Sequence, residues 1–187
     1  MSNIWFTSDL HFGHKNIIKY EGRPFSSVEE MDEVIIKNFN EVVKDGDLIY
    51  NIGDFALGKY NTIENLKTLK DRLNGYWFCV PGDHEPKEFN KVFSVLQQIQ
   101  IIKHDNLKII LCHYPLVFWP QSHYGTWMLH GHHHADSKKW VEQYTRGRIY
   151  NVCVGAHNYF PYNLDEIKEI MKNKEDNLNL LQKLKEK

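Results

Sequence analysis

The most constraining feature of this sequence is a pattern that recurs along the chain: a short apolar run stops, and Asp, His or an adjoining Gly follows at once. The pattern produces five separate clusters, which are Asp9-Leu10-His11, Gly53-Asp54, Gly82-Asp83-His84, His113 and Gly131-His132-His133-His134. In open α/β sheets, ligand sites collect beyond the carboxyl ends of the strands. The pattern therefore predicts an α/β fold in which the five clusters meet at one edge.

Between these clusters the sequence carries the signals of strands and helices. Short apolar or β-rich runs predict strands, and amphipathic stretches behind capping residues predict helices. The predicted strands are residues 3–8, 48–50, 76–80, 99–103, 107–112, 126–129 and 148–154. The first predicted helix spans residues 28–43 and is capped by Ser26 and Ser27, and the second is capped by Asn61 with Glu64. A third runs from Pro86 to about residue 97, and a fourth begins at Asn163 with Glu166.

The order of these elements predicts the architecture. Strands alternate with helices in the first half of the chain, which indicates βαβ units and a parallel sheet. The closer spacing of strands in the second half indicates a second sheet or mixed pairing. We therefore expect a two-layer β core flanked by helices. A single domain would span residues 1–172, and the Lys-, Glu- and Asn-rich residues 173–187 would form a helical extension or a tail.

Composition excludes several classes of protein. The chain has 187 residues, of which 42% are hydrophobic and 25% charged, as in an ordinary globular protein. Its net charge of −1 gives no bulk attraction to nucleic acid or to an anionic membrane. We see no secretory signal at the start, and no apolar run reaches the ~18 residues of a membrane span. The three cysteines lie in apolar runs, which predicts reduced, buried thiols and a cytoplasmic protein.

The residue types in the clusters predict metal binding. Carboxylate oxygens and imidazole nitrogens suit Zn²⁺, Mn²⁺ or Fe, and the clusters contain no soft thiolate. Two metals need about eight protein ligands if each takes about four, and a shared carboxylate can bridge them. With Asp54 counted twice as the bridge, the clusters supply that number from Asp9, His11, Asp54, Asp83, His113, His132 and His134.

Each cluster taken alone has a simpler interpretation. Asp9 and His11 are typical of an ordinary turn, and Asp83 is typical of a helix N-cap. His113 alone is typical of a half-buried histidine that has a hydrogen-bond partner within the protein. The run from His130 to His134 is harder to explain in this way, because it places four histidines within five internal residues. All five clusters would have to be coincidental at once, so we expect a metal site.

The order of the clusters resembles a known family. Asp-x-His, Gly-Asp, Gly-Asn-His-(Asp/Glu), His and Gly-His-x-His are the motifs of the calcineurin-like metallophosphoesterase superfamily, and the resemblance covers about residues 3–155. The opening segment from Thr7 to Ile18, followed by Arg23-Pro24-Phe25, is similar to a compact bacterial and phage branch of that superfamily. The resemblance implies a four-layer α/β/β/α sandwich of the metallophosphoesterase type, with two mixed sheets flanked by helices.

The resemblance also implies a role for each cluster. One metal would be held by Asp9, His11 and His134, the other by Asp83, His113 and His132, with Asp54 bridging them. His84 would act near the leaving-group oxygen, as general acid or as a stabiliser of the transition state. A hydroxide bridging the two metals would attack phosphorus. The metals would be divalent or trivalent Mn, Fe, Zn or Ni, with Mn favoured. Apart from the resemblance, His14 and Arg23 lie just past the first cluster and are candidate substrate contacts, because an arginine suits bidentate contact with phosphate. The alternative is that Arg23 is an ordinary surface residue.

One residue departs from the family pattern. The family has Asn where this chain has Asp83. An Asp can still bind a metal, and more tightly, but it adds negative charge beside an incoming phosphate. Two explanations stay open at this point: a site that works with the extra carboxylate, or a residue changed to slow turnover. We expect metal binding to survive and turnover to be lower than in the Asp83→Asn variant.

The predicted activity is metal-dependent hydrolysis of a phosphoester, by a phosphodiesterase or phosphatase acting on a nucleotide-like or other small soluble substrate. A nuclease is the rival within the enzymes, and the near-neutral charge makes nucleic acid the less favoured substrate. A metal-bound scaffold that serves as an interaction surface is the rival outside them. His84 and the near-complete ligand set count against that scaffold, whereas Asp83 favours it. The sequence predicts no oligomeric state.

Overall fold

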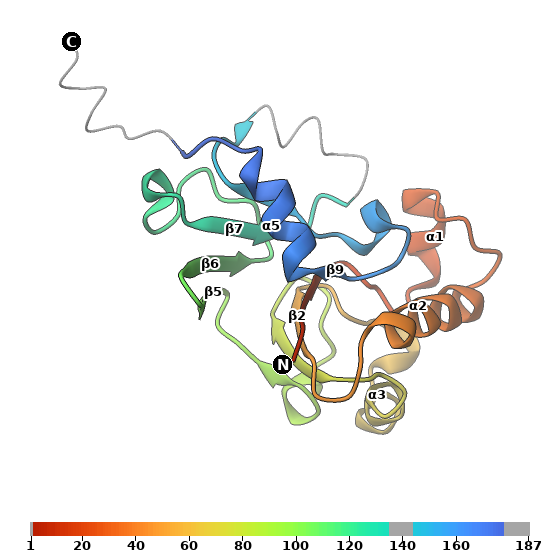
Figure 1. The fold of residues 1–187 in the computed structure, drawn as a ribbon. Coiled ribbons are helices and arrows are strands. Elements are labelled where there is room, and N and C mark those ends of the chain that lie inside the picture. Colours follow the sequence, from red (N-terminus) through yellow and green to blue (C-terminus); the bar gives the residue numbers. More distant parts are fainter. Residues whose placement is uncertain (1, 135–143, 178–187) are drawn as a thin grey trace, which may run out of the picture.

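The computed structural model describes residues 2–134 and 144–177 of the 187-residue chain. Its strands form two sheets (Figure 1). The first sheet has the order β4-β3-β2-β1-β9 and is made of β1 (Ile4–Thr7), β2 (Leu48–Ile52), β3 (Tyr76–Val80), β4 (Ser94–Val95) and β9 (Tyr162–Asn163). Strands β1 to β4 pair in parallel, and β9 pairs antiparallel to β1. The first sheet is therefore mixed.

The second sheet is also mixed. It has the order β5-β6-β7-β8 and is made of β5 (Ile99–His104), β6 (Leu107–Cys112), β7 (Trp127–His130) and β8 (Ile149–Asn151). Strand β5 pairs antiparallel to β6, and the other pairs are parallel. All the predicted strands are present. The last is shorter than predicted, because a 3-10 turn begins at Val154.

Helices flank the two sheets. The α-helices of the described residues are α1 (Lys15–Glu21), α2 (Val28–Val42), α3 (Ile63–Lys70) and α5 (Leu164–Lys172). The 3-10 turns are η1 (Gly58–Tyr60), η2 (Phe89–Lys91), η3 (Ser122–Tyr124) and η4 (Val154–His157). Figure 1 shows α2 and α3 on one side of the first sheet and the second sheet on its other side. The predicted fold class, two mixed sheets flanked by helices, is confirmed.

Local capping explains where the helices start. The Ser27 hydroxyl accepts a hydrogen bond from the Glu30 amide at the start of α2, and the Glu30 carboxylate accepts from the Ser26 amide. These two contacts form the predicted capping box. Helix α3 is capped by Thr62, one residue after the predicted Asn61, because the Thr62 hydroxyl accepts from the Asn65 amide.

Three apolar clusters of the described residues hold the layers together, and the two larger ones lie against the first sheet and between the sheets. Met31, Ile35 and Phe39 of α2 pack toward the first sheet, where the Phe39 ring stacks on Trp77. Between the sheets, Phe6 and Leu111 lie in a second core, to which α5 adds side chains. Each fully buried side chain of this kind contributes about 1.5–3 kcal/mol relative to an exposed one. These cores fix the relative positions of the strand ends.

The predicted helix that starts at Pro86 is wrong. The chain there forms η2 and then β4, which pairs in parallel with β3. Phe89 and Phe93 both pack against the ring of Phe55 in the core. This packing and the pairing with β3 outweigh the local helical signal.

Helix α1 was not predicted from the sequence. It is only 7 residues long, and no side chain caps its first turn. It ends at Gly22, whose φ of 61° is a left-handed conformation that glycine adopts without strain. The turn returns the chain toward the strand ends, so α1 borders the candidate site.

The predicted domain boundary at residue 172 coincides with the end of α5. Of the predicted extension, residues 178–187 lie outside the described part of the chain. The division into a domain and an extension therefore stays a prediction. Among the described helices, none combines the length and the apolar character needed to cross a membrane.

Candidate metal centre

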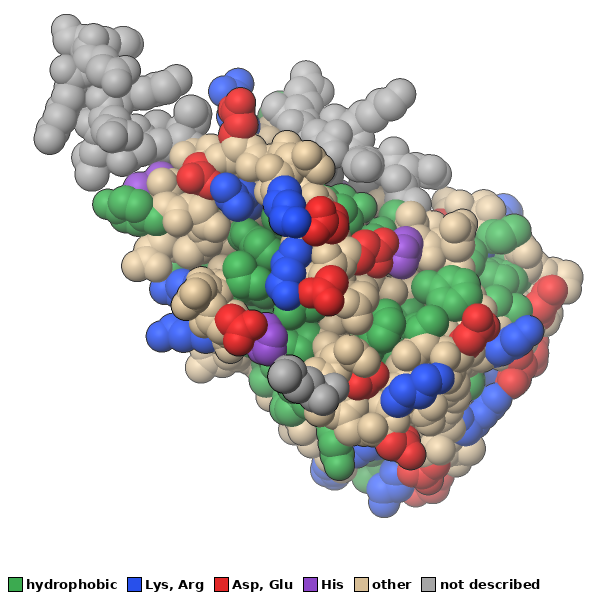
Figure 2. All heavy atoms as spheres, in the orientation of Figure 1, with side chains coloured by type: hydrophobic (Ala, Val, Ile, Leu, Met, Phe, Trp, Pro, Cys, Tyr) green, Lys and Arg blue, Asp and Glu red, His purple; other side chains and the backbone are tan. Residues whose placement is uncertain are grey.

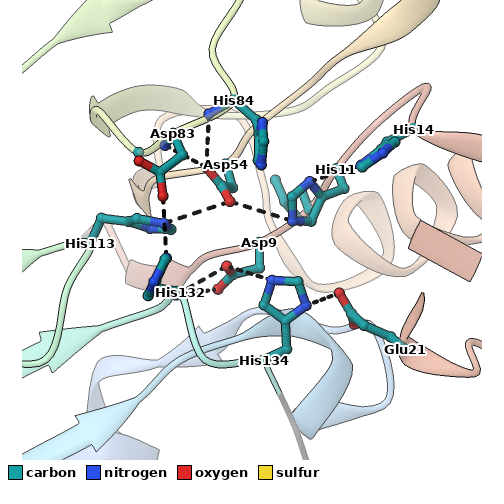
Figure 3. A network of polar contacts seen from close by, with 12 residues as sticks. Asp9, His11, His14, Glu21, Asp54, Asp83, His84, His113, His132 and His134 are labelled. Carbon is teal, nitrogen blue, oxygen red and sulfur yellow. Dashed lines mark hydrogen bonds and ion pairs between the residues drawn. The ribbon is translucent and has the colours of Figure 1, made fainter. Parts of the chain in front are cut away.

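The carboxyl ends of five strands carry the residues of the candidate site. Strand β1 leads to Asp9 and His11, β2 to Asp54, β3 to Asp83 and His84, β6 to His113, and β7 to His132 and His134. A parallel bridge between Ser8 and Cys153 joins the two sheets at this edge. Figure 3 shows the side chains converging from both sheets. The structure thus brings together the clusters that the sequence singled out.

The backbone at this edge is unusual. Five site residues are in the left-handed region with φ between 49° and 69°, and these are Asp9, His11, Asp54, His132 and His134. That conformation costs roughly 1–2 kcal/mol for an ordinary L-residue and less for Asp. Residues in such conformations cluster at active sites and persist where the surrounding structure holds them. The sharp turns direct these side chains toward one another.

Two glycines allow the loops to approach closely. A Cβ atom on Gly53 would lie 2.2 Å from His113 Nδ1, and one on Gly131 would lie 2.5 Å from Asp9 Oδ2. Both distances are far inside van der Waals contact. The glycines beside the Asp and His clusters are therefore required by the packing of the site itself.

Four side chains form what we call the first ligand group: Asp9, His11, Asp54 and His134. One potential ligand atom from each lies within 4.8 Å of all the others. His11 Nε2 is 3.5 Å from Asp54 Oδ2, and His134 Nε2 is 3.5 Å from Asp9 Oδ1. The spacing leaves a position that a cation can share among two carboxylates and two imidazoles.

Three side chains form the second ligand group: Asp83, His113 and His132, again within 4.8 Å of one another. His132 Nδ1 is 3.3 Å from Asp83 Oδ2. Asp54 links the two groups, because its Oδ2 atom is also 3.6 Å from His113 Nε2. Its other oxygen, Oδ1, accepts hydrogen bonds from the Asp83 and His84 amides. Asp54 therefore presents one oxygen to both groups.

Two buried nitrogens indicate that cations fit here. His11 Nε2 and His113 Nε2 are buried and have no hydrogen-bond partner among the described residues. His113 Nδ1 donates to the Ile52 carbonyl at 2.9 Å, so its Nε2 presents a lone pair toward Asp54. Leaving a buried polar atom unpaired costs about 1–3 kcal/mol. A metal ion between these lone pairs and the carboxylate would remove that cost.

Burial sets the protonation of the first ligand group without metal. Burial lowers the pKa of His11, and the neighbouring Arg23 and His134 lower it further. His11 is therefore neutral, as a metal ligand must be. Burial raises the pKa of Asp9, although His134 opposes the shift. A buried carboxylate that resists ionisation gains strongly from a nearby cation.

A comparison with protein families identifies this arrangement. A family model described as calcineurin-like phosphoesterase matches residues 2–183. The chain belongs to the calcineurin-like phosphoesterase family. The family resemblance predicted from the order of the five clusters is confirmed.

Relatives of this phosphoesterase-family chain come from an archaeon, phages and a bacterium. The uncharacterized protein MJ1445 of Methanocaldococcus jannaschii is 38% identical over 175 residues, which cover 91% of this chain and 92% of that protein. The gene 66 protein of Mycobacterium phage D29 is 26% identical over 95% of this chain and all of its own length. A crystal structure of AQ665 from Aquifex aeolicus, a protein of unknown function, has a TM-score of 0.74 and 26% identity, and covers 91% of this chain and all of its own.

Two other predicted site residues lie at the border of the ligand groups. His84 is exposed, and its ring centroid lies 5.7 Å from that of His11 and 6.1 Å from that of His14. The half-buried His14 ring in turn lies 5.3 Å from His11. Burial lowers the pKa of His14, with a further contribution from His84. Both imidazoles are within reach of a group bound at the first ligand group.

Arg23, which was predicted to contact substrate, lies behind the site. Its side chain is buried, and its guanidinium donates to the Asp9 carbonyl at 2.8 Å and to the Leu10 carbonyl at 3.0 Å. It also donates twice to Glu21 at 3.1 Å. This geometry favours a structural role for Arg23, in which it holds the turn after β1.

Three residues of this family member were not given roles from the sequence. Glu85 accepts hydrogen bonds from the amides of Asp54 and Gly82, and Tyr114 donates to Asp83 Oδ1. Glu21 contacts His134 Nδ1. The position of Glu85, directly after the third cluster, was a usable signal. Tyr114 directly follows the His113 cluster in the same way, although the sequence did not indicate Asp83 as its partner. Glu21 carried no signal, because its contact depends on how distant segments fold together.

Proposed function

We propose that this chain is a metal-dependent hydrolase of phosphoester bonds, with one metal at each ligand group and Asp54 as the bridge. The observation that carries the proposal is the pair of buried Nε2 atoms of His11 and His113, which face one Asp54 oxygen from opposite sides. Two cations bound there would neutralise the phosphate and lower the pKa of a bound water, so that hydroxide is available at neutral pH.

The chain's own residues would supply the remaining steps. His84 would donate a proton to the departing oxygen, because it is exposed beside the ligand groups and its backbone is fixed by Asp54. A positioned acid of this kind contributes typically 10²–10⁴-fold to a rate. His14 would contact the substrate from the same side. We make no such proposal for Arg23, because its donors are directed at backbone carbonyls and Glu21.

A small soluble phosphoester, nucleotide-like or otherwise, is the substrate class we favour over nucleic acid. Figure 2 shows Lys and Asp/Glu side chains intermixed over α5, where Lys168 pairs with Asp165 and Lys172 with Glu169. On this face, a mixed surface of this kind gives no continuous track for a phosphate backbone. The chain as a whole carries a net charge of only −1.

We further propose manganese as the favoured metal and the cytoplasm as the site of action. The ligand atoms are all oxygen and nitrogen, which suits Mn²⁺ as well as Zn²⁺ or Fe. Cys79, Cys112 and Cys153 are free and buried, as expected for a protein kept in a reducing compartment.

Metal analysis coupled to a phosphoester panel tests the proposal. The metal-stripped chain is reloaded with Mn²⁺, Zn²⁺, Fe²⁺ or Ni²⁺ and given bis-p-nitrophenyl phosphate, p-nitrophenyl phosphate, cyclic nucleotides and a short oligonucleotide. We expect hydrolysis that requires two metals per chain and is fastest on a small ester. Faster hydrolysis of the oligonucleotide than of the small esters would favour the alternative that the chain is a nuclease. No hydrolysis with any metal, by this chain or by Asp83→Asn, would favour the scaffold.

His84 is tested with the same substrates. His84→Ala should lose more rate on alkyl esters, whose leaving groups need a proton, than on p-nitrophenyl esters, whose leaving groups do not. His104→Ala, at a half-exposed histidine in β5, is the matched control. If the rate of hydrolysis fell equally on both ester types, His84 would not be the general acid.

A further inference from the structure

We propose that Glu21 is a positioning residue of the metal centre, which fixes the ring of His134 directly and the turn that carries Asp9 through Arg23. The inference rests on the metal-binding part of the proposed function. It concerns Asp9 and His134, which lie side by side in the first ligand group but come from different sheets, one after β1 and one after β7.

The first step is the contact between Glu21 and His134. Glu21 Oε1 contacts His134 Nδ1, while His134 Nε2 faces Asp9 Oδ1 at 3.5 Å (Figure 3). An ionised carboxylate only accepts hydrogen bonds, so the Nδ1 atom must carry the hydrogen. The Nε2 lone pair is then directed at the ligand group. A carboxylate behind a metal-binding histidine fixes both the tautomer and the ring orientation in this way.

The second step runs through Arg23. Both Glu21 oxygens accept from the Arg23 guanidinium, and Arg23 donates onward to the carbonyls of Asp9 and Leu10. Asp9 and His11 on either side of that turn are in the left-handed conformation. The guanidinium makes four hydrogen bonds here, two to the Glu21 carboxylate and two to carbonyls, which is one more than the three donors of a lysine allow. Glu21 thereby connects His134 to the turn that carries Asp9.

The position of Glu21 is not explained by the stability of its own helix. It is the last residue of α1, where the helix dipole disfavours a negative charge. Its side chain is only 12% exposed, and that of Arg23 is 1% exposed, so both charges have been removed from water. A buried ion pair is seldom a net source of stability compared with apolar side chains. The contact of Glu21 with His134, and its connection through Arg23 to the turn after β1, explain why a glutamate lies at this position.

Direct measurement of metal binding tests the inference. Mn²⁺ is titrated calorimetrically into the metal-stripped wild type, Glu21→Gln and Glu21→Ala. Losing a partner of this kind typically costs 10–100-fold in metal affinity. At one of the two sites, we expect Mn²⁺ to bind about 100-fold more weakly in Glu21→Ala and about 10-fold more weakly in Glu21→Gln. At the other site, we expect no change in either variant. Should Glu21→Ala fail to fold, Glu21→Gln, which keeps the size and one oxygen, decides the question.

Two controls separate positioning from a general structural effect. Glu41→Ala removes an exposed glutamate near the end of α2 and should leave both affinities unchanged. In a His134→Asn background, Glu21→Ala should cost less affinity than it does in the wild type, because the direct contact with His134 is already lost and only the route through Arg23 remains. Additive losses, or affinities within twofold of wild type in both Glu21 variants, would overturn the inference.

The outcomes for the inference and for the proposed function are distinct. If the wild type binds two Mn²⁺ but hydrolyses no ester, the proposed activity fails and the effect of Glu21 on binding still stands. If the wild type hydrolyses esters and the Glu21 variants bind metal normally, only the inference fails. A wild type that binds no metal would overturn both.

Discussion

The two ligand groups share Asp54 but differ in their exposure to solvent. In the first group, Asp9 is 0% exposed, His11 2% and Asp54 3%, whereas in the second group the side chains of Asp83 and His132 are 40% and 36% exposed. The first group is mostly buried, with only the side chain of His134 partly exposed at 23%, whereas the second is open at Asp83 and His132 over a buried His113. We therefore expect a phosphoester to approach from the side of Asp83 and His132.

The two groups also differ in what holds them. Behind the first group, Glu21 and Arg23 connect His134 to the turn that carries Asp9. Behind the second, the exposed Tyr114 donates to Asp83 Oδ1 and leaves Oδ2 near His132. A prearranged site loses less entropy on binding than a loosely held one. The comparison predicts a tight first metal and a weaker, more readily exchanged second metal.

The largest effect should come from the residue that joins the groups. Asp54→Asn keeps the shape of the side chain and tolerates the left-handed backbone, but it removes the charge that both groups share. We expect a fall of about 10³-fold or more in kcat/KM, since the metals supply several kcal/mol of the stabilisation of the transition state. Steady-state kinetics with saturating Mn²⁺ measure it. A loss of less than tenfold would mean that the groups work independently.

A matched pair of variants tests the predicted difference in affinity. His132→Asn and His134→Asn each remove one imidazole from one group, at positions where Asn tolerates the backbone. We expect His132→Asn to retain one tightly bound Mn²⁺ per chain and His134→Asn to weaken the tighter site by about 10–100-fold. Metal content after dialysis reports both. If His134→Asn retained a tightly bound Mn²⁺ and His132→Asn did not, the second group would be the one that binds metal more tightly.

Asp83→Asn restores the family residue in the open group. We expect weaker binding of the second metal and a several-fold higher turnover, because about 1 kcal/mol of repulsion toward phosphate corresponds to roughly fivefold in rate. The hydrogen bond from Tyr114 lowers the pKa of Asp83, so this carboxyl is ionised at neutral pH. Titration with Mn²⁺ and kcat at saturating metal measure the two effects.

Tyr114→Phe provides the control for that variant. If Tyr114 offsets the charge of Asp83, its loss should slow the wild type but leave Asp83→Asn nearly unchanged. An unchanged or lower turnover of Asp83→Asn would show that the extra carboxylate does not limit this site.

The smallest expected effect is a difference in pH dependence between the groups. Burial raises the pKa of Asp9; in His134 burial acts in the opposite direction, but the Glu21 and Asp9 carboxylates outweigh it and raise the pKa. Both shifts favour the protonated ligand, whereas burial lowers the pKa of His11 and keeps it neutral. Protons therefore compete with metal at the first group through Asp9 and His134, at a higher pH than usual for these residue types. Between about pH 8 and about pH 5, around the ordinary His value of 6.5, affinity there should fall several-fold more than at the second group.

Calorimetric titrations at several pH values check this expectation. The ratio of the two dissociation constants should approach one as the pH falls. A ratio that is constant across the range, or one that increases on acidification, would contradict the assignment of the enclosed group as the proton-sensitive one.

The clusters could be predicted from the sequence because their signal is local. Asp9, Asp54 and His113 each follow an apolar strand directly, and parallel strands place their carboxyl ends at one edge whatever the details of packing. The same reasoning gave the two sheets. It failed at Pro86, where the contacts of Phe93 with Phe55 and the pairing with β3 decide the structure.

The supporting residues could not be predicted, because their roles arise from contacts between segments far apart. Glu21 and His134 are separated by more than half of the chain, and Arg23 is distinguished from a surface arginine only by its burial. The left-handed conformation of His11 and His132 could not be predicted either, since only a small minority of residues adopt it, even though histidine is enriched among them. Sequence patterns therefore give the ligand types, whereas tertiary structure gives their orientation.

The left-handed turns at the strand ends have a consequence for how such a protein can evolve. Replacing His11 or His132 by glycine would relieve backbone strain at the cost of a ligand. In a chain of this size each kcal/mol so regained raises the melting temperature by about 2–4 °C. Selection for heat tolerance alone would thus act against these two ligands. Persistence of these histidines in a thermophilic relative would be a sign that activity itself is under selection.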